Sequence, residues 1–248
     1  MNSEGRSLKF EKSPVGPEKK PAPTEVEIIS EIKIGGGQFG EIFEAEAKIG
    51  TKNRNFVIKK FKDVPGIGDA PSRSAEEVAA VAFENYGYAK KSGLKVFPTY
   101  RLGEDKKSIL MTNANLGEQV CIGLNDDSPR LKDFGMNKLD YIANANDCAE
   151  LLMNQVRKAT QAGISLRNDS FLFLVDKRNP EVLDFVIGDL DNVMRSKQEQ
   201  KKLLQSNIMH AFTALDLFIR RSVVADRRQE YESWAHNLEG AYLVELED

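Results

Sequence analysis

The stretch IKIGGGQFGEIFEAEA, residues 32–47, decides how the first half of this chain folds. It contains the pattern G-x-G-x-x-G, formed by Gly35, Gly37 and Gly40. A dinucleotide-binding turn with this pattern opens a helix, and an acidic residue about 20 positions later holds the ribose. Here Phe43 and Ala45 alternate with polar residues as in a strand, and the residue about 20 positions on is the basic Lys59. The stretch therefore predicts a glycine hairpin between two strands.

The surrounding sequence predicts more strands and one helix. Short apolar runs with glycines between them extend from residue 26 to about 61, and two further strand-like runs occupy 95–103 and 108–115. Residues 74–92 predict a helix, because Ser74 and Glu77 form a capping box at its start and a glycine follows its end. Residues 26–115 are thus expected to form an antiparallel sheet with one helix.

Residues 116–248 are expected to be mostly helical. An amphipathic helix ends at Gly163, and the two strands FLFLVD (171–176) and VLDFVIGDL (182–190) follow it. Two amphipathic helices close the chain, with apolar stripes over 204–219 and 231–238. The fold class is therefore α+β, with two lobes that divide near residue 115.

Composition excludes several classes of protein. The 248 residues carry a net charge of −3, which gives no case for a general nucleic-acid binder, and no apolar run approaches the roughly 20 residues that a membrane span requires. The two cysteines, Cys121 and Cys148, make no disulfide framework, so a reducing, cytoplasmic setting is expected. Residues 1–25 are rich in proline and charge and are expected to form a disordered tail.

A strand, a glycine loop, a second strand and then a strand bearing a lysine resemble the protein kinase-like superfamily, from about residue 28 to about residue 220. The resemblance implies a two-lobed fold that binds Mg-ATP between its lobes. Lys59 would bring its charge to the α and β phosphates, with Lys60 as the alternative. The implied nucleotide-binding residues are Ile34, Gly35, Gly37, Phe39, Gly40, Ile42, Val57, Lys59 and Met111.

The resemblance also implies a carboxylate on the helix that pairs with the strand lysine. Glu84 is the candidate, and Glu77, two helical turns earlier, is the alternative. The run ILMTNAN is similar to the segment that joins the lobes of a kinase. Met111 lies near the gatekeeper position, and backbone groups at 112–115 would face the adenine.

The stretch GISLRNDSFLFLVD, residues 163–176, occupies the place of the catalytic loop but lacks most of the residues that the family uses there. Asn168 stands where the family has its aspartate, and an amide cannot accept a proton at neutral pH. The neighbouring Asp169 is the candidate for orienting the acceptor hydroxyl. The position of the second metal ligand is apolar in every register, because residues 171–173 are Phe, Leu and Phe.

The candidate Mg²⁺ ligands follow the second strand of the hairpin. Asp189 lies at the end of that strand and Asp191 two residues later, and Mg²⁺ prefers oxygen ligands. The tripeptide Asp133-Phe134-Gly135 matches the kinase metal motif literally, but it precedes the catalytic-loop region and is rejected because its order in the chain is wrong.

Three functions compete. The first is a divergent ATP- and Mg²⁺-dependent phosphotransferase acting on a protein Ser or Thr. The second is a pseudokinase that binds nucleotide or a protein partner without turnover, which the missing histidine, asparagine and activation segment favour. The third is a small-molecule kinase, which has less support because such enzymes usually keep the loop aspartate and asparagine. The acceptor, the partner and the oligomeric state are left open by the sequence.

Overall fold

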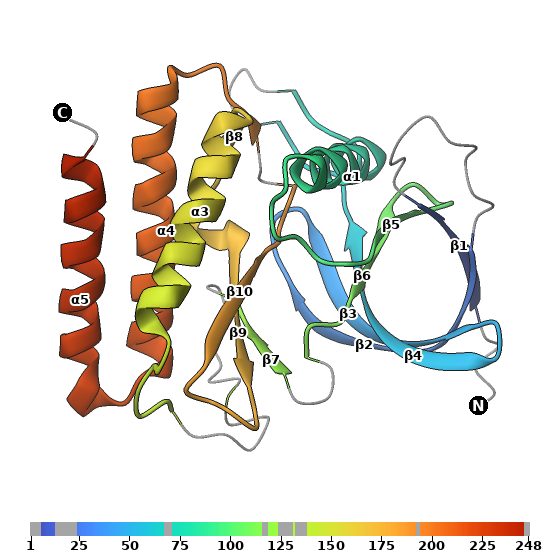
Figure 1. The fold of residues 1–248 in the computed structure, drawn as a ribbon. Coiled ribbons are helices and arrows are strands. Elements are labelled where there is room, and N and C mark those ends of the chain that lie inside the picture. Colours follow the sequence, from blue (N-terminus) through green and yellow to red (C-terminus); the bar gives the residue numbers. More distant parts are fainter. Residues whose placement is uncertain are drawn as a thin grey trace. The chain divides into compact units, whose positions relative to one another are not determined.

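The computed structural model describes residues 6–12, 24–66, 71–115, 119–123, 131, 138–191 and 194–245. These residues form an α+β protein with antiparallel strands and four α-helices (Figure 1). Contacts divide the chain into two compact units: unit 1 is Met1–Lys91 with Phe97–Asn113, and unit 2 is Ser92–Val96 with Ala114–Asp248.

Unit 1 is built around a closed barrel of antiparallel strands in the order β1-β2-β3-β4-β6-β5. The expected sheet is thus present, but it closes on itself. The barrel core consists of small and β-branched residues together with larger apolar ones: Val26, Ile28, Ala45, Ala47, Phe56, Ile58 and Leu110. The strands are β1 (Arg6–Lys12), β2 (Thr24–Gly36), β3 (Gly40–Ile49), β4 (Lys52–Phe61), β5 (Tyr100–Gly103) and β6 (Ser108–Thr112).

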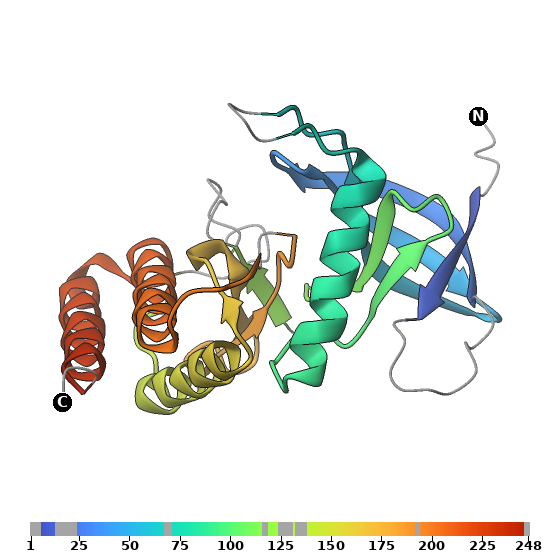
Figure 2. The ribbon, with the colours of Figure 1, turned by 90° about the horizontal axis from the view of Figure 1, so that it is seen from above.

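The helix α1 (Ala75–Lys91) of unit 1 packs on the outside of the barrel against β4, β5 and β6 (Figures 1 and 2). The predicted capping box is present, since Ser74 and Glu77 exchange hydrogen bonds at its start. The buried face of α1 is mostly alanine, which allows close approach to the strands. Its members are Ala75, Val78, Ala79, Ala82, Tyr86 and Ala89.

Part of the expected N-terminal tail is a strand, so the assignment of residues 1–25 as disordered is wrong for residues 6–12. β1 pairs with β2 through Arg6↔Ile28 to Phe10↔Thr24, and with β5 through Phe10↔Gly103 to Lys12↔Arg101. Backbone hydrogen bonds on both sides stabilise a strand whatever its composition. Residues 1–5 and 13–23 lie outside the described residues.

The described residues of unit 2 form a three-stranded sheet, a short two-stranded pair and the helices α3, α4 and α5. The sheet has the order β10-β9-β7, and the two-residue strands β8 and β11 form a separate pair. The expected hairpin is confirmed as β9 and β10, but β7 lies in a region expected to be helical. Val120 is buried and pairs with Val175 of β9, so burial favours a strand there. The strands are β7 (Gln119–Ile122), β8 (Ile164–Ser165), β9 (Phe171–Asp176), β10 (Leu183–Ile187) and β11 (Met194–Arg195).

The three expected helices of unit 2 are present, and their apolar stripes form its core. Phe218 of α4 packs on Phe173 of β9, with ring centroids 4.7 Å apart. Tyr231 and Ala235 are the buried residues of α5, and the hydroxyl of Tyr231 accepts a hydrogen bond from the Ile142 amide at 2.7 Å. The helices are α3 (Ala145–Gln161), α4 (Gln200–Ser222) and α5 (Ala225–Val244), and a 3₁₀ turn, η1 (Asn168–Ser170), precedes β9.

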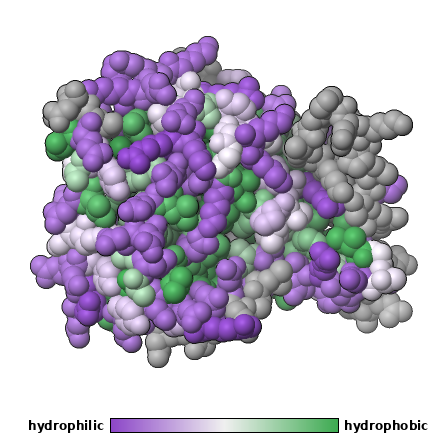
Figure 3. All heavy atoms as spheres, viewed as in Figure 1, coloured by the Kyte–Doolittle hydropathy of each residue, from purple (hydrophilic) through white to green (hydrophobic). Residues whose placement is uncertain are grey.

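Hydrophilic side chains cover most of the face seen in Figure 3, with hydrophobic ones scattered among them. None of the described helices combines the length and the apolar character that a membrane-spanning segment needs.

Candidate functional site

The glycine hairpin predicted from the sequence connects β2 to β3. The Gly37 amide donates a hydrogen bond to the Gly40 carbonyl at 2.8 Å, which closes the turn. A Cβ added at Gly40 would lie 2.3 Å from the Lys60 carbonyl oxygen, so packing against β4 requires glycine there. A Cβ at Gly35 or Gly37 would have no heavy atom within 4 Å. The fold of unit 1 therefore needs only one of the three predicted glycines to be a glycine.

Four of the predicted nucleotide-binding residues lie on one face of the strands β3, β4 and β6. Ile42 pairs with Lys59, and Val57 pairs with Met111. Directly paired residues of an antiparallel ladder point to the same side, and positions two apart along a strand do so as well. The strand register therefore brings three apolar side chains and one lysine together on the outer side of the barrel.

The structure distinguishes Lys59 from Lys60. Lys60 lies on the same side of β4 as Ile58 of the barrel core, forms an ion pair with Glu31, and its Nζ lies 4.3 Å from the ring centroid of Phe43. Lys59 lies on the opposite side, is only 9% exposed, and its Nζ is 5.4 Å from the centroid of Phe61. Lys59 is therefore the lysine that shares a face with Val57.

The predicted helix carboxylates do not face this lysine. Glu84 and Glu77 are both exposed, whereas Lys59 is buried. At 100° per residue, Glu84 lies on the side of α1 opposite its buried face. No carboxylate occurs on that buried face among the described residues, and Glu77 is bonded to Ser74. The assignment of Glu84 as the partner of Lys59 is therefore corrected.

The remaining residues of the predicted loop have less regular surroundings. Ile34 lies at a register shift between Lys33 and Gly35, so it interrupts the pairing of β2 with β3. Phe39 is half-buried in the turn, and the guanidinium of Arg73 lies 5.5 Å from its ring centroid.

Side chains fix the end of β6, at the segment predicted to face the adenine. The Thr112 amide donates to the Thr99 carbonyl at 3.2 Å, so this amide is engaged within unit 1. The next residue, Asn113, is 2% exposed, and its Nδ2 donates to Oε1 of Glu44 at 2.6 Å. Sequence reasoning missed the pair of Glu44 and Asn113, because 69 residues separate them.

In unit 2, the loop 164–170 is held by an asparagine that sequence reasoning also missed. Asn207 of α4 is fully buried and accepts a hydrogen bond from the Leu166 amide at 2.8 Å. Its Nδ2 donates to the Ile164 carbonyl at 2.9 Å and to Thr160 Oγ1 at 3.0 Å. A fully satisfied buried amide of this kind fixes the backbone on which Asp169 is carried.

Asp169 is half-buried in η1, and α4 packs on this turn. His210, one helical turn after Asn207, is close enough to sense its charge. Burial lowers the pKa of His210 and the positive charge of Arg167 lowers it further, while the Asp169 carboxylate raises it. His210 is the titratable group of α4 that interacts with the candidate acceptor-side residue.

The predicted metal ligands lie just beyond β10. Asp189 has a φ of 47°, one of two positive φ values at described non-glycine residues. Side chains rarely adopt this conformation, and residues held in it cluster at functional sites. Leu190 is fully buried and Asp191 is 6% exposed, so burial of the intervening leucine fixes the turn that carries both carboxylates.

The carboxylates of Asp189 and Asp191 are oxygen ligands of the kind that Mg²⁺ prefers. Mg²⁺ is usually held by one or two carboxylates together with substrate phosphates and water. Among the described residues no three His, Cys, Asp or Glu side chains group as a metal site, so a complete metal cage of protein ligands is not offered there. Asp133, Phe134 and Gly135 lie outside the described residues.

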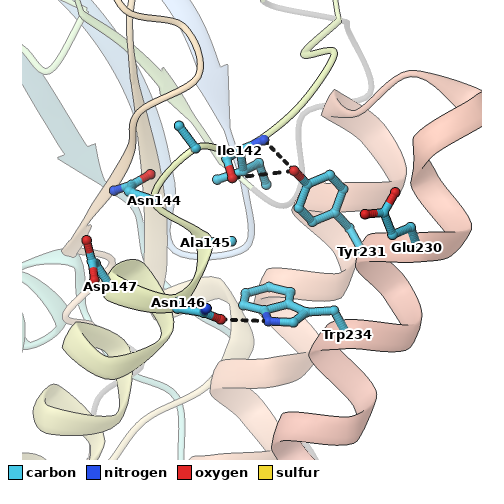
Figure 4. Close-up of a pocket in the computed structure, with 9 residues that line it drawn as sticks. Ile142, Asn144, Ala145, Asn146, Asp147, Glu230, Tyr231 and Trp234 are labelled. Carbon is cyan, nitrogen blue, oxygen red and sulfur yellow. Dashed lines mark hydrogen bonds between the residues drawn. The ribbon is translucent and has the colours of Figure 1, made fainter.

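A pocket of about 390 Å³ lies between the start of α3 and the side of α5 (Figure 4). Trp234 Nε1 donates to Asn146 Oδ1 at 3.0 Å across it. Its Asp147 and Glu230 are exposed, and none of the predicted site residues lines it.

Neither cysteine is suited to nucleophilic chemistry. Both are buried, and burial raises the pKa of the Cys148 thiol to about 12.

No protein-family model matches this sequence, and a search of curated proteins found no match either.

Proposed function

We propose that this chain is a divergent member of the protein kinase-like superfamily that binds Mg-ATP and phosphorylates a Ser or Thr hydroxyl of a protein. The observation that carries the proposal is the strand register of unit 1. It gives Ile42, Val57, Lys59 and Met111 a common face beside the glycine hairpin. A face of this kind offers apolar contact to a base and one buried cation to its phosphates.

The glycines support the same proposal. Since Gly35 and Gly37 have open space around them, the fold does not explain why they are glycines. Backbone amides without side chains can approach phosphate oxygens closely, which is the use that a nucleotide loop makes of glycine.

Unit 2 would supply the metal and acceptor groups. Asp189 and Asp191 would hold Mg²⁺, which neutralises charge on the transferring phosphoryl group when it is bound. Asp169 would orient the acceptor hydroxyl and take its proton as the oxygen bonds to the γ-phosphorus and the bond to the ADP oxygen breaks. Phosphoryl transfer depends mainly on positioning and charge, so it tolerates the loss of other loop residues.

A pseudokinase is the second candidate, and two observations favour it. Phe171 and Phe173 are fully buried in β9, so neither position after the loop offers a second metal ligand. The buried face of α1 carries no carboxylate among its described residues, so the helix glutamate that the resemblance implies is absent from that face.

The test measures Mg-ATP-dependent thermal stabilisation and radiolabel transfer together, in wild type, Asp189→Ala and Asp169→Ala. Asp176→Ala is the matched control, because this aspartate lies at the other end of β9 and accepts only a local bond from the Arg178 amide at 2.8 Å. We expect stabilisation in wild type, Asp169→Ala and Asp176→Ala but not in Asp189→Ala, and transfer only in wild type and Asp176→Ala.

Each other outcome has a distinct meaning. No stabilisation of the wild type by Mg-ATP refutes the nucleotide site. Stabilisation that depends on Asp189 without any transfer selects the pseudokinase. Transfer that survives Asp169→Ala refutes the role given to that residue.

A further inference from the structure

Glu44 and Asn113 form a polar pair at the edge of the face that carries Ile42, Val57 and Met111. Glu44 pairs with Val57 across β3 and β4, and it lies two residues from Ile42, so its side chain is on the same side of the barrel. Asn113 follows Met111 by two residues at the end of β6 and is 2% exposed. The bond from Asn113 Nδ2 to Glu44 Oε1 is short, at 2.6 Å, as expected for a charged acceptor.

This bond acts on the part of β6 where regular pairing stops. The last pair between β4 and β6 is Phe56↔Thr112, so Asn113 receives no support from the ladder. Two hydrogen bonds join Thr112 to Thr99. The Thr112 amide donates to the Thr99 carbonyl, and the Thr99 amide donates to Thr112 Oγ1 at 2.9 Å. Just beyond Thr112, the Glu44 carboxylate accepts a hydrogen bond from the Asn113 side chain and so helps to hold this residue in place.

We propose that Glu44 is a positioning residue for the nucleobase: by holding Asn113, it fixes the backbone groups after β6 that hydrogen-bond the edge of a purine. This inference rests on the proposed nucleotide site. The ligand class is a purine nucleoside or nucleotide, and the effect of Glu44 is confined to the base because the glycine hairpin and Lys59 lie further along β3 and β4. A preorganised hydrogen-bonding edge lowers the ordering cost of binding.

The chain contains a matched control for this pair. Glu46, two residues after Glu44 on β3, accepts a hydrogen bond from Asn53 Nδ2 at 3.0 Å. The chemistry and the strand are the same, but Asn53 lies on β4 near its hairpin with β3 and not on β6. Loss of the Glu46 bond therefore reports what a more exposed Glu–Asn pair on the same strand contributes to the fold, and the thermal melts show the effect of each substitution on stability.

The test measures the affinity of adenosine, Mg-ATP and magnesium tripolyphosphate by calorimetry for wild type, Glu44→Met, Glu44→Ala, Glu44→Gln and Glu46→Ala, with a thermal melt of each protein. Glu44→Met keeps the length of the side chain but has no carboxylate acceptor. It replaces Glu44→Ala in the affinity measurements if the alanine variant does not fold. We expect Glu44→Met and Glu44→Ala to weaken the affinity for adenosine and for Mg-ATP by the same factor, about tenfold. The affinity for magnesium tripolyphosphate should stay unchanged. Glu44→Gln, which retains an acceptor oxygen, should restore most of the affinity, and Glu46→Ala should match the wild type.

Two results overturn the inference while the proposed function stands. One is wild-type binding of adenosine that Glu44→Met does not weaken. The other is an equal loss of adenosine and tripolyphosphate affinity, which would mean that Glu44 only stabilises the fold. If wild type binds neither adenosine nor Mg-ATP, the proposed function fails and this inference fails with it.

Discussion

The amide of Gly188 donates a hydrogen bond to the carbonyl oxygen of Ser170 at 2.8 Å. This bond continues the pairing of β9 with β10 by one step beyond Phe171↔Ile187. Asp169 precedes one partner and Asp189 follows the other, so the candidate acceptor residue and the candidate metal ligand lie at the same end of one hairpin. The relationship lies entirely within unit 2.

The two adjacent lysines of β4 should have separable roles. Lys59→Ala should abolish Mg-ATP-dependent stabilisation, because Lys59 is the cation on the face with Ile42 and Val57. Lys60→Ala should keep that stabilisation but lower the free energy of unfolding by about 1 kcal/mol, because its ion pair with Glu31 is lost. Urea titration with and without Mg-ATP measures both effects, and an exchange of the two phenotypes would refute the assignment of Lys59.

The glycines of the hairpin should divide into a functional one and a structural one. Gly37→Ala should leave the free energy of unfolding within about 0.5 kcal/mol of wild type, because its Cβ has open space. Gly37→Ala should also weaken the affinity for Mg-ATP by about tenfold, because the added methyl group keeps phosphate oxygens from approaching the backbone amides. Gly40→Ala should lower the free energy of unfolding by about 2 kcal/mol or more, because the added Cβ clashes with the Lys60 carbonyl oxygen. Chemical denaturation measures the stability of both variants, and calorimetry measures their affinity for Mg-ATP. A normal Mg-ATP affinity in Gly37→Ala would argue against a phosphate loop.

The positive φ at Asp189 predicts different stabilities for two variants that both remove its carboxylate. Asp189→Gly should be more stable than Asp189→Ala, because glycine adopts a φ of 47° without steric cost. Asp189→Ala should lower the free energy of unfolding by about 1 kcal/mol, because alanine adopts the left-handed backbone conformation less readily than aspartate. Both variants should lose Mg²⁺-dependent nucleotide binding. Lys106→Gly is the control, since Lys106 has a φ of 54° in an exposed turn, and it should bind Mg-ATP normally.

The titration of His210 should report the charge of Asp169. Its pKa is expected below the ordinary 6.5, because of burial first and then of Arg167. Asp169→Asn removes the opposing attraction and should lower the pKa further, whereas Arg167→Gln should raise it. The imidazole signals in NMR spectra measured over pH give these values, and His236→Gln identifies the second histidine. An unchanged His210 titration in Asp169→Asn would show that the two side chains do not interact.

The same shift has a consequence for stability. Because the folded pKa of His210 is below its unfolded value, the unfolded state takes up the proton first as the pH falls. Stability should therefore decline from about pH 6.5 down to the folded pKa and then level off with respect to this group. His210→Gln should remove that part of the decline in a series of denaturation curves, and a decline of the same size in the variant would assign it to other groups.

Local pattern determined much of this protein. The capping box at Ser74, the glycine hairpin and the strand Phe171–Asp176 are set by residues close in sequence, and all three are found where the sequence predicts them. The alternation along β4 also separated Lys59 from Lys60, because side chains on a strand change sides at each residue.

Tertiary structure decided which surfaces are buried. Val81 of α1 is 39% exposed, whereas alanines form most of the buried face of the helix. The residue types could not rank these faces, because the choice depends on how closely the helix approaches the barrel. In the same way, β1 depends on strands that are distant in sequence, and Asn207 reaches the loop at Leu166 from 41 residues away. Contacts of this kind join segments that have no common local pattern, so only the folded chain determines them.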